Sequence, residues 1–286
     1  MTGFSLFSDL TTALQTSSNF QRISFIKTPS SNTALIPHST WLNAGNPAAG
    51  TTPTVGLGGA VAVSKTSTGA LQFNNPVSGK NNFLMRLGLY RNNSSASLGG
   101  TYYLVDRLAH ANVSIDQVDG AFSPVIDGTA RLAAGEGAQI ICEVTTALGA
   151  AVTNVFALTY TDQDGNSSVT QQVTTIASQA VDKFAYSATN GPTRLFVPLA
   201  SGDRGARTIT DWDLVSGIQT GAMTIALVRV LAILPEPLAS SYVENEYAIS
   251  MQNFVKIPND ACLQIFFVPA LANTSELQAE IFLVQG

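Results

Sequence analysis

The second half of the chain is a series of short apolar runs that are rich in β-branched residues and separated by turn-forming residues. The clearest runs lie at 139–146, 154–160 and 168–176. Segments of this length, bounded by Gly, Asn, Asp and Pro, are typical of strands in antiparallel sandwiches and barrels. The series continues at 194–200, 207–212, 223–234, 247–257, 262–268 and 277–284. The sequence therefore predicts a mainly β protein with one jelly-roll-like antiparallel β-sandwich, and no long amphipathic helix between residues 139 and 286.

The run at residues 223–234 is apolar on both of its strand faces. A strand of this kind is covered on both sides. We expect a second sheet on one side, and either the N-terminal segment or another subunit on the other. Pro235 and Pro237 are expected to end the strand, since proline cannot donate to a ladder.

The first 82 residues have a different pattern. Phe4, Phe7, Leu10 and Leu14 recur at helical spacing and predict one short helix near residues 6–15. Beyond it, turn-rich clusters at 28–32, 46–50 and 55–59 interrupt regular structure. We expect residues 1–82 to form an extended, irregular arm with one short helix, or else short strands with long loops. Residues 83–286 are then a β-rich domain with its sandwich core in 139–286.

The chain carries little charge. Asp, Glu, Lys and Arg make up 12% of its 286 residues, about half of the roughly 25% in an ordinary soluble domain. Ser, Thr, Asn, Gln and Gly take their place, and a neutral polar surface suits a molecule whose flanks are covered by other subunits. Formal net charge is −5, with no basic stripe of the kind that neutralises phosphates. The nearest arginine pairs, Arg86 with Arg91 and Arg204 with Arg207, are expected to be solvated, so we expect no direct nucleic-acid binding.

The N-terminus lacks the basic start and apolar core of a signal peptide. The longest apolar stretch, 222–234, is too short to span a bilayer and contains Arg229. We therefore expect synthesis in the cytoplasm and no membrane partner. In that compartment Cys142 and Cys262, both in strand-like runs, are expected to be buried free thiols.

Residues 162–166, Asp-Gln-Asp-Gly-Asn, superficially resemble a calcium-binding loop. The helix-loop-helix site needs glycine at its sixth position and a bidentate glutamate at its twelfth, and neither is present here. Asp-Gly between two alternating runs instead predicts a β-hairpin, because Gly165 accepts the positive φ of a tight turn.

Other candidate chemistry is weaker. The only imidazoles are His38 and His110, and His110 lies near Asp106, but the Gly-x-Ser-x-Gly motif of serine hydrolases is absent. The glycines at 56–59 lack the βαβ context of a dinucleotide site. Asp116 with Asp119, and Glu244 with Glu246, are candidate carboxylate pairs by sequence proximity alone. We therefore expect no catalytic, cofactor or metal site, and no enzyme activity.

Three segments carry a resemblance. They are Tyr-Leu-Val-Asp-Arg-Leu at 103–108, Tyr-Thr-Asp-Gln-Asp-Gly at 160–165 and Leu-Ala-Ser-Gly-Asp-Arg-Gly-Ala-Arg at 199–207. Together they resemble virion structural proteins of tailed bacteriophages, over roughly residues 100–235. The motifs are structural and carry no catalytic residues.

This resemblance implies a virion location and a binding role. The usual major capsid fold of tailed phages has a long spine helix, and no such helix is evident here. The resemblance therefore favours a capsid decoration or cement protein, forming a homo-oligomer, with a trimer favoured, on the major capsid protein or another virion protein. Independently of the resemblance, the low charge and the doubly apolar run at 223–234 imply burial between chains beyond about 2,000 Å². Residues 1–82 have little regular apolar pattern, so we expect them to lie over neighbours and to order only on assembly.

Two alternatives to a decoration protein stay open. The first is a structural component of the tail, the portal vertex or the fibre base. The second is a glycan-binding receptor module, in which Trp41, Trp212 or Tyr242 would stack on sugars. As core or interface anchors these aromatic residues need no ligand, and we favour that interpretation.

Overall fold

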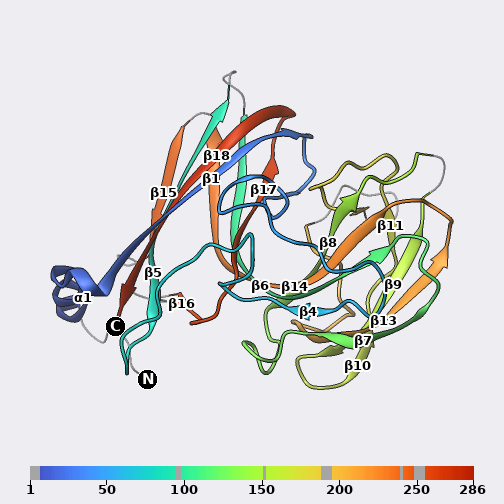
Figure 1. The fold of residues 1–286 in the computed structure, drawn as a ribbon, viewed down its shortest axis with the longest axis horizontal. Helices are drawn as coiled ribbons and strands as arrows, with labels where there is room; N and C mark the ends of the chain where they lie inside the picture. The colour runs from blue at the N-terminus through green and yellow to red at the C-terminus, as the bar shows by residue number, and fades with distance from the viewer. Residues whose placement is uncertain (1–6, 94–97, 151–152, 188–194, 239–240, 248–254) are drawn as a thin grey trace.

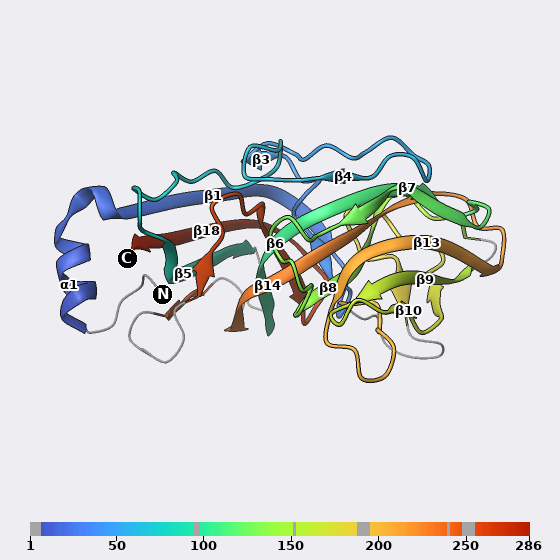
Figure 2. The same ribbon diagram turned by 90° about the horizontal axis from the view of Figure 1, so that it is seen from below.

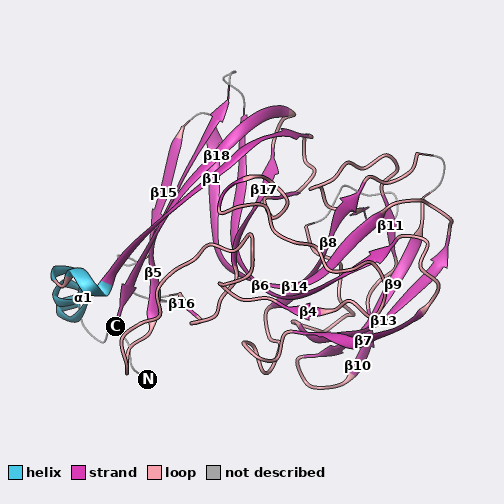
Figure 3. Ribbon diagram, viewed as in Figure 1, coloured by secondary structure: helices cyan, strands magenta, loops and turns pink. Residues whose placement is uncertain are grey.

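The computed structural model describes residues 7–93, 98–150, 153–187, 195–238, 241–247 and 255–286. Within them the chain is mainly β, and the fold class predicted from the sequence is confirmed (Figure 3). Among these residues the one α-helix is α1 (Phe7–Gln15), which matches the predicted helix near 6–15 and is followed by the short 3-10 helix η1 (Ser17–Asn19). No helix in these residues is long and apolar enough to cross a membrane.

The strands form three antiparallel sheets (Figure 1). Sheet A has the order β15-β5-β18-β1-β3 with β16 on β5, sheet B has β2-β17-β6-β14-β8 with β4 on β6, and sheet C has β12-β11-β9-β13-β7 with β10 on β9. The bounds are β1 Phe20–Asn32, β2 His38–Ser39, β3 Gly45–Asn46, β4 Val61–Ala62, β5 Asn82–Asn93, β6 Leu98–Ser114, β7 Gly120–Asp127, β8 Ala138–Thr146, β9 Val155–Asp162, β10 Ser167–Val169, β11 Val173–Thr175, β12 Tyr186–Ser187, β13 Ala206–Ser216, β14 Ala222–Leu238, β15 Tyr242–Glu246, β16 Lys256–Ile257, β17 Leu263–Pro269 and β18 Asn273–Gln285.

Two long strands of sheet B, β6 and β14, take part in two separate cores. Each has 17 residues, and they pair with each other along their whole length. One core lies between sheet B and sheet C and contains Met223 and Ile225 of β14. The other lies between sheet B and sheet A and contains Leu231 and Leu234 of the same strand. Figure 2 shows β6 and β14 passing from the part of the molecule with β1 and β18 into the part with β9 and β13. The expected single sandwich in 139–286 is therefore wrong: two sandwiches share sheet B.

Two β-bulges let one strand serve both cores. In the ladder of β6 and β14, the register shifts at Leu108 of β6 and at Leu231 of β14. A bulge inserts one residue and so moves the following side chains to the other face. Consistent with this, neighbours Leu108 and Ala109 both lie in the core against sheet C. Leu231 and Ala232 both lie in the core against sheet A.

The opposite face of β14 is covered by the chain itself. Ala226 and Val228 pack there with Phe184 and Phe266, whose rings meet edge to face with centroids 5.2 Å apart. Phe184 lies in the connection from β11 to β12. The expectation that the N-terminal segment or another subunit covers this face is therefore corrected.

The prolines do not end this strand either. β14 continues to Leu238 and pairs with β6 through Pro235 and Glu236. β8 pairs with β14 only as far as Arg229. Beyond that point β14 has no described neighbour on its second side, and an edge strand tolerates proline because its outward N–H needs no partner.

In the N-terminal region, residues 33–82 follow the alternative of short strands with long loops, since β2, β3 and β4 have two residues each, but β1 departs from both expectations. β1 is a 13-residue strand of sheet A that pairs with β18 on one side and, at Ile26 and Lys27 only, with β3 on the other. Its Ile23 and Phe25 are buried in the core, and Leu10 of α1 packs against Phe83 and Val284. These residues are folded against their own chain, because the period-2 apolar positions of β1 complete the face of sheet A.

Deleting residues 1–30 is therefore expected to abolish cooperative folding, because it removes β1 and opens the core beside β18. The measurement is thermal unfolding followed by near-ultraviolet circular dichroism. Deleting residues 1–15 is the control, since it removes α1 but keeps β1, and a cooperative transition should survive. A 1–30 deletion with the wild-type spectrum and transition would contradict the placement of β1.

Candidate functional site

The predicted hairpin at 162–166 is confirmed. β9 and β10 pair across it, with Thr161 opposite Ser167, and Gly165 has a φ of 91°. The Asp162 carboxylate accepts the backbone N–H groups of Asp164 and Asn166, each at 2.8 Å. The carboxylate that suggested a cation ligand is thus used to close the turn.

Gly165→Val is expected to lower the free energy of unfolding by about 1 kcal/mol or more, because a β-branched residue is strained at positive φ. Urea unfolding measures the loss. Gly165→Asn serves as the matched control, since asparagine tolerates this region better and should lose less. Equal stability of the valine variant and the wild type would place the strain elsewhere.

The segments that carry the phage resemblance contact one another. The Gln163 side-chain oxygen accepts the Arg204 N–H at 2.8 Å, and the Arg207 guanidinium donates to the Gln163 carbonyl at 2.9 Å. The Tyr160 hydroxyl donates to Asp203 at 2.5 Å and accepts the Ala200 N–H at 2.8 Å. Burial together with the hydrogen bond to Asp203 raises the pKa of Tyr160 to about 12. The motif residues therefore fasten the hairpin to the turn before β13.

His110 is built into the interior. Its Nδ1 accepts a hydrogen bond from Arg107 Nε at 3.1 Å, and its ring meets Trp41 edge-on. Burial and the Arg107 charge lower the pKa of His110 to about 2. The imidazole is therefore neutral, with its Nδ1 lone pair occupied, which is unsuited to general-base chemistry.

Asp106, the suspected partner of His110, instead pairs with Arg131. The two side chains form a forked pair, with N–O distances of 3.0 and 3.1 Å, and Asp106 also accepts the Cys262 N–H at 2.8 Å. Next to it in sequence, Arg107 pairs with Glu143 at 2.9 Å, and both side chains are fully buried. These two ion pairs hold sheet B where β6 passes from one sandwich to the other.

The remaining candidates are also engaged in structural contacts. Glu244 and Glu246 both face Arg86, at 3.3 and 3.8 Å, and Asp119 accepts the Leu214 N–H at 2.6 Å. Asp116 accepts a hydrogen bond from Ser114. In the glycine-rich loop, Gly56 donates its N–H to the Asn112 carbonyl. Among the arginines expected to be solvated, Arg91 pairs with buried Glu236 and Arg204 pairs with Glu136. The thiols of Cys142 and Cys262 are free and lie in different core clusters.

The aromatic candidates for sugar stacking divide into two kinds. Trp41 and Trp212 are each 1% exposed, whereas Tyr242 is 49% exposed. Trp212 stacks on Phe156 with ring centroids 4.8 Å apart. In the part of the chain that the structure describes, no group of three His, Cys, Asp or Glu side chains could hold a metal ion.

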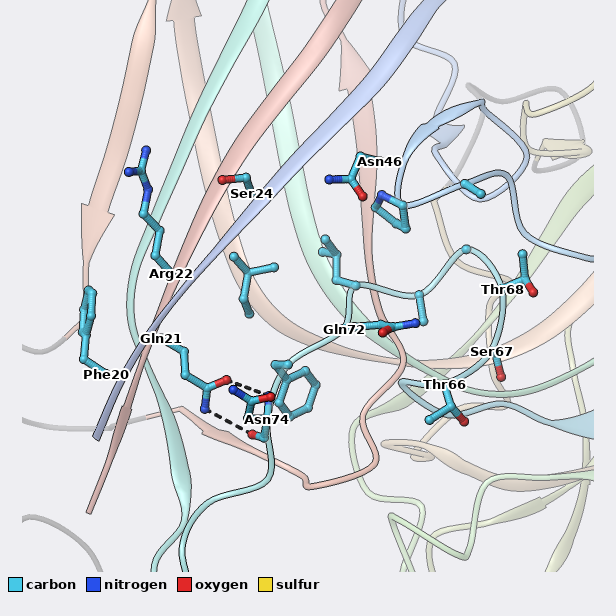
Figure 4. A pocket seen from close by; sticks show the side chains of 17 residues that line it. Phe20, Gln21, Arg22, Ser24, Asn46, Thr66, Ser67, Thr68, Gln72 and Asn74 are labelled. Atoms are coloured by element: carbon cyan, nitrogen blue, oxygen red, sulfur yellow. Dashed lines mark hydrogen bonds between the residues drawn. The ribbon is translucent and has the colours of Figure 1, made fainter. Parts of the chain in front are cut away.

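A feature that the sequence did not reveal is a groove of about 790 Å³ beside β1. Its walls are residues 20–24 of β1, residues 46–48 and residues 66–74 (Figure 4). At one end the Gln21 amide donates to the Asn74 carbonyl at 3.1 Å and accepts the Asn74 N–H at 2.7 Å. Apart from Arg22, the polar side chains of the lining are uncharged amide and hydroxyl groups, which bind by hydrogen bonding rather than by charge.

The groove runs along the edge of a strand. Successive side chains of a strand point to opposite faces, so five consecutive residues line one cavity only where the strand presents its edge. β18 pairs with β1 from Phe20 to Lys27 on one side. On the other side β3 pairs only with Ile26 and Lys27. Among the described strands, none pairs with residues 20–25 on the groove side.

No protein-family model and no curated protein matches this sequence. Among solved structures, the VP2 subviral particle of infectious bursal disease virus aligns with 93% of this chain and 80% of its own, at 9% identity and a TM-score of 0.20. The structure of the Gx strain of that virus aligns over the same shares at 10% identity and a TM-score of 0.22. TM-scores of this size carry no weight for fold or function.

Proposed function

We propose that this chain is a non-enzymatic structural subunit of a phage particle, a capsid decoration or cement protein that binds the capsid shell. The observation that carries the proposal is the low charge of the chain, in which Asp, Glu, Lys and Arg make up 12% of the residues. Eight charged side chains are buried among the residues that the structure describes. They are Lys27, Arg91, Arg107, Lys183, Asp106, Glu143, Asp162 and Glu236. Outside the core the chain presents few charged side chains for its length, as suits a surface covered by other subunits.

The resemblance to tailed-phage virion proteins supports the same role. Its motif residues make the contacts between the hairpin and the turn before β13. These contacts explain the motif residues as structural, so no catalytic role is needed to account for them. The glycan-binding alternative loses two of its three aromatic residues to the cores, because Trp41 and Trp212 are buried.

An exposed apolar tip supplies a contact surface for the shell. Val118, Val215 and Ile218 are 75%, 43% and 79% exposed. Val215 lies near the end of β13, Ile218 in the loop that follows it and Val118 in the loop between β6 and β7. The two loops are joined by the hydrogen bond from the Ile115 N–H to the Gly221 carbonyl at 3.0 Å. Exposed aliphatic side chains gathered at one end of a sandwich mark a site of protein association.

The test is cosedimentation of the purified chain with capsids of its phage that lack it. We expect saturable binding to capsids. Val118→Ser with Ile218→Ser should weaken it, since two apolar anchors are lost. Val169→Ser, at a position on β10 that is 52% exposed and lies outside this tip, should bind as the wild type does. Binding to tails or to one vertex alone would favour the tail or portal role. Hydrolysis of polysaccharide or peptidoglycan would contradict the proposal.

A further inference from the structure

The backbone of β1 directs free hydrogen-bonding groups into the groove. The Thr28 N–H donates to the Ala44 carbonyl at 2.9 Å, and Ile26 pairs with Asn46 in the same register. Backbone N–H and C=O groups of a strand alternate between its two sides. Those of Ser24 and Arg22 therefore point to the same side as those of Thr28 and Ile26. Within the described residues, no backbone or side-chain group pairs with them there.

We propose that this groove binds an extended, uncharged polypeptide segment of a partner, which adds to sheet A as a strand along residues 20–25 of β1. The added strand would continue the line of β3, which already occupies the same edge at Ile26 and Lys27. Strand addition of this kind takes its affinity from main-chain hydrogen bonds.

The chemistry of the walls selects such a segment. The one charged side chain of the lining is Arg22, which pairs with Glu280 and lies over the Phe282 ring. The remaining polar side chains are neutral, so a charged guest gains nothing there. A polypeptide backbone matches the alternating donors and acceptors of β1, whereas a sugar ring does not repeat at the spacing of a ladder.

The groove also limits the length of the guest. The two hydrogen bonds between Gln21 and Asn74 lie near one end of the groove. Strand β3 and residues 46–48 lie at the other end. The open edge between them, residues 20–25, spans about 20 Å at roughly 3.3 Å per residue. The Gln21 side-chain amide fixes the wall formed by residues 66–74, because it hydrogen-bonds to both the N–H and the carbonyl of Asn74, as a neighbouring strand would. The guest is therefore a segment of about six residues.

The test uses the full chain and a capped heptapeptide of alternating threonine and valine, followed by amide chemical shifts and by titration. We expect shifts confined to residues 20–25 and 66–74. Ser24→Pro should weaken binding at least tenfold, because it removes an N–H that points into the groove. An edge strand tolerates this proline. Ser24→Thr, which keeps the N–H, should bind as the wild type does.

A second comparison needs no protein variant. The same peptide with every backbone nitrogen methylated should not bind the wild-type chain. The proposal would be overturned if the parent peptide did not bind, or if it bound Ser24→Pro as tightly as the wild type. It would also be overturned if the methylated peptide bound as well as the parent peptide, or if an oligosaccharide bound the chain and still bound Ser24→Pro. Because the test contains no capsid, its outcome is separate from that of the capsid role, which cosedimentation decides.

Discussion

Glu143→Ala is expected to destabilise the protein by about 3–5 kcal/mol, measured by urea unfolding. The Glu143 carboxylate lies 2.9 Å from Arg107 Nη1, and neither side chain is exposed. Removing one partner of a buried ion pair leaves the other charge in the interior without compensation. Gln264, 3.3 Å from the same nitrogen, is neutral and does not replace the lost charge.

The control for this prediction removes both charges. Glu143→Leu with Arg107→Met should recover much of the lost stability, since a buried pair is often replaced by apolar residues at little cost. A single Glu143→Ala variant as stable as the wild type would show that Arg107 finds another partner or reaches water. In that case sheet B would be open where β6 passes between the sandwiches.

Trp212→Ala is expected to cost about 3–5 kcal/mol, the range for truncating a large buried aromatic side chain. The indole is 1% exposed, stacks on Phe156 and donates its N–H to the Gln117 carbonyl at 2.8 Å. Its removal leaves a cavity in the core between sheets B and C and an unpaired carbonyl. Thermal unfolding and urea unfolding should both report the loss.

Trp212→Phe separates the two contributions, because it keeps most of the ring contact and loses only the hydrogen bond. Its loss should be clearly smaller than that of Trp212→Ala. If Trp212→Ala instead kept full stability and lost binding to a glycan, Trp212 would be a ligand-binding residue. The assignment of this side chain to the core would then be wrong.

The sequence was sufficient for the local features of the fold. The hairpin at 162–166 was predictable because Gly165 and Asp162 meet a requirement of the turn within five residues. The mainly β class followed from runs of alternating and β-branched residues, which indicate strands without reference to their partners. The helix α1 followed from apolar residues at helical spacing.

The features that depend on distant pairing were not predictable. β1 contains Pro29 and a Ser-Ser-Asn sequence at 30–32, which resemble a turn, and only its ladder with β18 makes it a strand. The bulges at Leu108 and Leu231 change the side-chain face within β6 and β14, so a constant period fails along these strands. The groove exists because Gln21 meets Asn74, 53 residues away.

The most direct test of the account is the copy number of this chain in intact particles, measured by quantitative mass spectrometry against the major capsid protein. A decoration or cement protein repeats with the shell lattice. The account therefore predicts a fixed ratio of copies of this chain to copies of the major capsid protein, and the same ratio in heads that lack tails. A few copies confined to tails or one vertex, or absence from the particle, would contradict it.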